Sequence, residues 1–167
     1  MDAPKVHGMN LHRTGGRCRT GIFAESGIAA LVDDEAAIRV AVEDQTHVGP
    51  VLADGSLRVV NRGYDADRKH WKEAVGRAEF IGAPDLGSLQ VSFFGPFYGG
   101  YHVVELDPDY RWAIVAGPSR DYLWLLTRTQ HAPTELVDRM IESAARLGFP
   151  TERLIRVDHR PVDAPAL

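Results

Sequence analysis

From residue 52 onward, short segments that alternate apolar and polar side chains follow one another at regular spacing, and turn residues separate them. The segments are residues 57–61, 70–80, 89–94, 101–106, 112–116 and 122–129, and the turns include Asp54-Gly55, Pro108-Asp109 and Gly117-Pro118. A period of two places successive side chains on opposite faces of a strand. Strands at this spacing predict an all-β sandwich or barrel and not alternating βαβ units.

One segment, "APTELVDRMIESAARLGFP" at residues 132–150, has the period of a helix instead. Its apolar stripe consists of Leu136, Val137, Met140, Ile141, Ala144 and Leu147. Pro133 and Thr134 suit a first turn and Gly148 suits a C-terminal cap, so we expect an amphipathic helix of about three to four turns. The polar face mixes acidic and basic residues, which favours packing against the protein's own sheet over a membrane surface. Residues 153–159 predict a last short strand.

Residues 29–45, "AALVDDEAAIRVAVEDQ", fit two structures equally well. They suit a helix capped by Asp33 or Asp34, or a strand through Ile38, Val40 and Val42, and the periodicity does not decide. With 167 residues, 44% hydrophobic and 25% charged, the whole chain predicts a single domain with an ordinary core.

Charge and cysteine content exclude several classes of protein. The net charge is -4, and 19 basic residues are scattered among 23 acidic ones, so nucleic acid is not expected as a partner. Cys18 is the only cysteine, which excludes an internal disulfide and a thiolate zinc cluster. The first residues contain neither an apolar run of ~7–15 residues nor an apolar segment before Cys18. The chain is therefore expected in the cytoplasm, without a visible anchor.

Catalytic and metal-binding motifs are missing from the sequence. The seven histidines are scattered, and no pair has the helical spacing of a metal site. The glycines of "GPFYGG" are not followed by Lys-Ser or Lys-Thr at the start of a helix, as a phosphate loop requires. The expected protein is therefore not an enzyme, and it needs neither a metal nor a cofactor.

The stretch "VSFFGPFYGGYHVVEL", residues 91–106, contains five aromatic rings and three glycines. The rings supply large apolar area, and the glycines let the backbone bend and approach what the rings cover. This combination suits the opening of a barrel of about eight strands, whose interior is either filled by side chains or holds one small ligand. If Ala74, Gly76 and Ala78 face inward, they leave room for a ligand. The pattern alone leaves a filled and a ligand-holding barrel equally open.

Two long strings make the resemblance to a family specific: "FFGPFYGGY" and "GPSRDYLWLLTR". With the segment from "LADGSLRVVNRGYD" onward, they resemble the bacterial lipocalins of the outer-membrane lipoprotein type, relatives of apolipoprotein D. The resemblance covers residues 52 to about 158. It implies an up-and-down barrel of about eight strands with a C-terminal helix, closed at one end. It also implies binding of fatty acids or lysophospholipids, no enzyme activity, and members that are usually found in the outer membrane.

The resemblance extends to signature residues but fails near the N-terminus. Asp107 and Tyr110 lie in the second family signature, and Arg128 matches the arginine of the third. Gly16 matches the first signature, but Cys18 stands where the family has tryptophan. Residues 1–50 otherwise do not match the family, so the N-terminal strands are either missing or altered, and closure of the barrel is left open. Divergence and a shifted reading frame would both produce this pattern.

The favoured function is non-catalytic carriage of a small hydrophobic ligand of the fatty acid or lysophospholipid class. From alternation, the candidate ligand-binding residues are Trp71, Phe93, Phe97, Tyr98, Tyr101, Trp112 and Trp124. The alternative is a structural or inactive remnant with an open or filled cavity. The family also implies membrane contact, and the sequence leaves a homodimer open.

Overall fold

The computed structural model describes residues 23–31, 44–65, 68–83 and 86–157. The strands are β1 (Phe23–Leu31), β2 (Asp44–Val51), β3 (Leu57–Asp65), β4 (His70–Phe80), β5 (Ser88–Phe94), β6 (Phe97–Leu106), β7 (Trp112–Ala116), β8 (Leu123–Thr127) and β9 (Ile155–Arg156). One α-helix, α2 (Thr134–Arg146), and a short 3-10 helix, η3 (Thr151–Arg153), lie between β8 and β9. The predicted strands, the helix and the last short strand are all confirmed.

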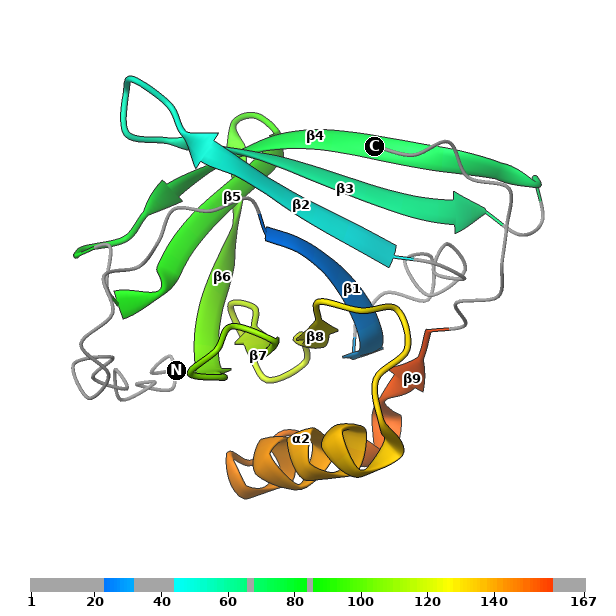
Figure 1. The fold of residues 1–167 in the computed structure, drawn as a ribbon. Coiled ribbons are helices and arrows are strands. Elements are labelled where there is room, and N and C mark those ends of the chain that lie inside the picture. The colour runs from blue at the N-terminus through cyan, green and yellow to red at the C-terminus, as the bar shows by residue number, and fades with distance from the viewer. Residues whose placement is uncertain (1–22, 32–43, 66–67, 84–85, 158–167) are drawn as a thin grey trace.

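The strands form one continuous antiparallel ring (Figure 1). From β2 to β8, each strand pairs with the next one along the chain. The strand β1 pairs with both β8 and β2, which joins the two ends of the sheet, and β9 adds to β1. This topology confirms the predicted up-and-down barrel. The backbone pairing of β1 with both β2 and β8 also closes the barrel.

The N-terminal strands, which the sequence left open as missing or altered, are present. The first described strand begins at Phe23, and residues 11–18 with Gly16 and Cys18 lie outside the described residues. Of the ambiguous stretch 29–45, the first three residues end β1 and the last two begin β2, while residues 32–43 lie outside the description.

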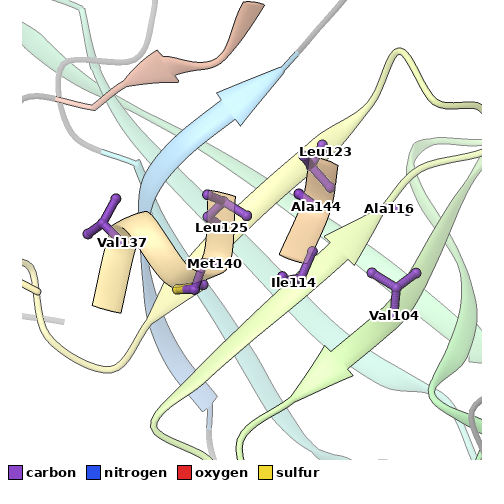
Figure 2. Packing of buried hydrophobic residues seen from close by; sticks show 8 residues of the cluster. All are labelled: Val104, Ile114, Ala116, Leu123, Leu125, Val137, Met140 and Ala144. Carbon is purple, nitrogen blue, oxygen red and sulfur yellow. The ribbon is translucent and has the colours of Figure 1, made fainter. Parts of the chain in front are cut away.

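The helix α2 covers one side of the ring, next to β7 and β8 (Figure 1). Met140, with 1% of its surface exposed, packs with Ile114 and Leu125, which are fully buried. Figure 2 shows this cluster, whose buried members are Val104, Ile114, Ala116, Leu123, Leu125, Val137, Met140 and Ala144. Burial of Val137, Met140 and Ala144 from the predicted apolar stripe confirms that the helix packs on its own sheet, although Leu147 is 43% exposed. These strand residues therefore define the outer face of the barrel.

The opposite faces of the same strands form the interior. One inner cluster contains Ala113, Val115 and Leu126, and another contains Leu57, Val59, Ala78 and Leu89. Tyr101 packs against both clusters, so the two belong to one interior.

The two ends of the barrel carry different turns. At one end, which we call the hairpin end, β5 and β6 meet through Phe94 and Phe97, and β7 turns into β8 at Gly117. At the other end, which we call the base, lie the turns between β4 and β5 and between β6 and β7.

Within the described parts of the chain, no helix is long and apolar enough to cross a membrane. The same residues contain no group of three or more His, Cys, Asp or Glu side chains that could hold a metal ion.

Candidate ligand-binding site

Three of the seven predicted ligand-binding residues meet in the interior of the barrel. Phe93 belongs to the inner cluster around Leu89, Trp124 to the one around Val115, and Tyr101 to both. Each of the three rings is partly buried and keeps some accessible surface. Aromatic rings of this kind supply much of the apolar area on which a hydrophobic ligand could pack.

The predicted small face of β4 also turns inward. Ala78 packs in the inner cluster with Leu57, and the unbroken ladder between β3 and β4 puts Ala74 and Gly76 on the same face. A Cβ atom on Gly76 would come within 2.7 Å of the Phe93 ring. Real Cβ atoms do not approach other atoms so closely, so a side chain at position 76 would collide with the ring. The Phe93 ring therefore occupies part of the space that the small residues leave.

The other four predicted residues lie elsewhere. Trp71 is on the outer face of β4, where the guanidinium carbon of Arg62 lies 5.1 Å from the centre of its ring. Trp112 packs against the outer cluster beneath the helix. Phe97 and Tyr98 are at the tip of the β5–β6 hairpin, 78% and 51% exposed. Whether any of the seven contacts a ligand stays a prediction.

A polar residue that the sequence did not single out also faces inward. Asn61 pairs with Ala74 on the inner face, and its Oδ1 atom is buried without a hydrogen-bond partner. A buried carbonyl oxygen without a donor is costly, so it is suited to accept a hydrogen bond from a ligand or a water molecule. Alternation in "LRVVN" could have found it, because Val59 and Asn61 share one face.

Polarity on the inner face changes from the base to the hairpin end. Toward the base, Ala113 and Leu126 are almost fully buried. Asn61 comes next along the paired strands β3 and β4, and the register places Lys72 on the same face, closer to the hairpin end. An apolar lower part, an amide above it and a cation near the rim form a gradient that matches an amphiphile with its tail toward the base.

The residues of the second and third family signatures, Asp107, Tyr110 and Arg128, meet at the base. Asp107 is buried and accepts hydrogen bonds from the Arg111 side chain at 2.8 and 3.1 Å and from its backbone N–H at 3.1 Å. These bonds hold the pKa of Asp107 below its usual value. Arg128 donates from Nε to the Tyr110 carbonyl at 2.7 Å, and its backbone N–H bonds the Arg111 carbonyl at 2.9 Å. This network fixes the turn between β6 and β7.

A groove of about 350 Å³ lies outside the barrel, between the base and the start of α2. Its lining includes Trp112, Arg128 and Leu136. This groove is separate from the inner face, and Trp112 belongs to it rather than to the interior.

Comparison with known proteins agrees with this geometry. A family model described as a lipocalin-like domain matches residues 36–159. Outer membrane lipoprotein Blc of Escherichia coli K12 is 51% identical over 104 residues, which is 62% of this chain and 59% of the relative. The protein of the same name from Vibrio cholerae is 48% identical over 111 residues, 66% of this chain and 65% of the relative. The chain thus spans less than two thirds of the length of these relatives.

Solved structures share the fold at low sequence identity. Lobster apocrustacyanin A1 superimposes with a TM-score of 0.67 at 9% identity, over 89% of this chain and 82% of that one. The cockroach allergen Per a 4 has a TM-score of 0.65 at 12% identity, over 87% of this chain and 89% of that one. These similarities support the barrel fold alone.

The relatives also correct one expectation from the sequence. A cytoplasmic location was expected from the first residues of the chain, but relatives with about half of their aligned residues identical are named outer membrane lipoproteins. That expectation is wrong, because such extensive similarity outweighs an argument from the absence of an apolar run in the first residues. The family match covers most of the chain, and this protein therefore belongs to the lipocalin family, with a sequence similar to that of the bacterial outer membrane lipoproteins.

Proposed function

We propose that this protein binds the acyl chain of a fatty acid or lysophospholipid inside the barrel and carries it without catalysis. The observation behind this proposal is the accessible surface that aromatic rings of the inner face keep, although Val115 and Leu126 on that face are buried. Ile114, Leu123 and Leu125 on the outer face are fully buried beneath the helix, whereas Phe93 and Tyr101 on the inner face keep accessible surface. A tightly filled interior would bury the inner rings as completely.

The inner-face gradient supports an orientation for the ligand. Burial of an acyl chain against apolar residues contributes about 0.8 kcal/mol for each methylene, so the tail belongs toward the base. The head group then lies near Asn61, whose Oδ1 can accept a hydrogen bond, and near Lys72, whose charge favours a carboxylate or phosphate. Small hydrophobic ligands are general to the lipocalin family, and an outer-membrane location, as in the relatives' names, is part of the same proposal.

A second candidate is a barrel whose interior is filled and which acts only through its surface. The contact that favours it is the ring of Phe93, which occupies the space above Gly76. If similar contacts extend through the interior, no acyl chain can enter.

Titration with a fluorescent fatty acid distinguishes the two candidates. The carrier predicts saturable binding with a defined stoichiometry, and the filled barrel predicts none. Competition by palmitate and octanoate then tests the pocket itself. Palmitate has eight more methylenes, and burial of half of these, at about 0.8 kcal/mol each, gives more than a hundredfold tighter binding. Equal affinities would rule out an acyl chain in the interior.

A further inference from the structure

The tip of the β5–β6 hairpin exposes an unusual amount of aromatic surface. Phe94 and Phe97 are 77% and 78% exposed, and Tyr98 is 51% exposed. The two phenylalanines face each other across the end of the hairpin. Large exposed apolar patches on a soluble domain usually mark a contact with another molecule.

The hairpin also lacks charged residues along most of its length, including its tip. Between Asp85 and Glu105 the sequence contains no Asp, Glu, Lys or Arg. The one histidine in this span, His102, is partly buried, and this burial lowers its pKa, so the imidazole is neutral at pH 7. Moving this tip into a medium of low dielectric constant therefore carries no penalty for burying a charge.

The area and chemistry of the tip favour lipid over protein as the partner. If one buried aromatic side chain covers roughly 200 Å², the exposed parts of the three rings amount to roughly 400 Å². This is about half of the ~800 Å² that each partner buries in a stable protein complex. Phenylalanine suits the acyl region, and tyrosine, with an apolar ring and a hydroxyl, is enriched at the level of lipid head groups.

We propose that Phe94, Phe97 and Tyr98 insert into the surface of a lipid bilayer. The tip adjoins Phe93, whose ring belongs to the inner face, so insertion would bring the hairpin end of the barrel onto the membrane. The contact itself does not depend on the proposed function. Its use in passing an acyl chain between bilayer and barrel rests on that function.

Flotation of the full chain with phosphatidylcholine vesicles tests the contact. We expect the wild type to bind, and the double variant Phe94→Ser with Phe97→Ser to bind at least tenfold more weakly. The matched control is Leu52→Ser with Ile81→Ser, which removes two apolar side chains that are each 45% exposed and lie near the base. The control should bind like the wild type. Equal binding by the tip variant, or equal losses in both double variants, would overturn the proposal.

Three further measurements separate insertion from other contacts. Tryptophan at position 97, introduced as Phe97→Trp, should be quenched by brominated phosphatidylcholine more strongly than the tryptophans of the wild type. Binding that requires phosphatidylglycerol and disappears at high salt would instead indicate adsorption by charge and contradict insertion. Sedimentation velocity could instead show a wild-type dimer that the tip substitutions dissociate. This result, without vesicle binding by the wild type, would assign the tip to a contact with a second copy of the chain and contradict insertion.

The same protein samples keep this inference distinct from the proposed function. Vesicle binding without fatty acid binding would support the membrane contact and refute the carrier. Fatty acid binding without vesicle binding would support the carrier and refute the membrane contact.

Discussion

Substitution of Ala74 by tryptophan tests whether the barrel interior has room for a ligand. Ala74 lies on the inner face of β4, paired with Asn61, on the hairpin side of the contact between Gly76 and Phe93. It already has a Cβ atom, so Ala74→Trp adds an indole ring without straining the backbone. Its neighbour Val75 is on the outer face and 48% exposed, which makes Val75→Trp a matched control on the same strand.

The two candidate functions predict different effects of this ring. If the interior is accessible, the indole occupies space that about three or four ligand methylenes would fill, at about 0.8 kcal/mol each. The loss of roughly 2.4–3.2 kcal/mol raises the Kd for a fatty acid about a hundredfold, with little change in Tm. If the interior is filled, overpacking destabilises the fold by about 1–3 kcal/mol, or roughly 2–12 °C in Tm for a chain of this size.

Fluorescent fatty acid titration and thermal unfolding of both variants provide the measurements. Val75→Trp should leave the free energy of unfolding within about 0.5 kcal/mol of the wild type, as for most surface substitutions, and should leave the Kd unchanged. Tryptophan at position 74 should also emit at shorter wavelength than tryptophan at position 75. A normal Kd for Ala74→Trp, with the fold intact, would refute the argument that the acyl chain lies against this part of the inner face.

Two other predictions concern the fold. Met140→Ala should lower the free energy of unfolding by about 2–5 kcal/mol, because it empties a buried site between Ile114 and Leu125. Leu147→Ala, at the 43% exposed C-cap of the same helix, should cost less than about 1 kcal/mol, and similar losses for both variants in urea denaturation would contradict the observed packing. The folded-state pKa of Asp107 is lowered, so its contribution to stability is present above the usual carboxyl pKa and is lost as the pH falls through the folded value. Asp107→Asn should therefore cost about 2 kcal/mol at pH 7 and flatten the loss of stability in acid, whereas an unchanged acid profile would show that the Arg111 contact does not determine it.

The strands from β3 to β8 could be predicted because each alternates over several residues and ends at a turn with identifiable chemistry. The Asp54 carboxylate, for example, bonds the backbone N–H and the hydroxyl of Ser56 in the turn before β3. Residues 29–45 gave no such answer, because small and β-branched residues there fit both a helix and a strand. The pairing of β1 with both β8 and β2 depends on long-range contacts that no local pattern contains.

The residues of the candidate site could be predicted where a strand alternates without a break and its sequence shows which face points inward. The same period that turns Ala74, Gly76 and Ala78 inward must turn Trp71 outward, so its assignment to the interior was inconsistent with the small face. Trp112 needed the position of the helix, which decides that its face of β7 is the outer one. In β6, a register shift between Val103 and Glu105 changes the alternation, and the sequence gives no sign of it.

The two ends of the barrel differ in a way that determines how a ligand could enter. At the base, hydrogen bonds from Arg111 to Asp107 and from Arg128 to Tyr110 tie the turn between β6 and β7 to the end of β8, and Leu126 is buried above them. Opening this end would break charge-assisted bonds and expose apolar core. At the hairpin end, Asp121 ties the turn between β7 and β8 to Arg153, whereas the β5–β6 hairpin presents uncharged rings. The path of lowest cost for an acyl chain therefore runs past Phe93 and Tyr101, which puts the lipid-binding and membrane-binding proposals at the same end of the molecule.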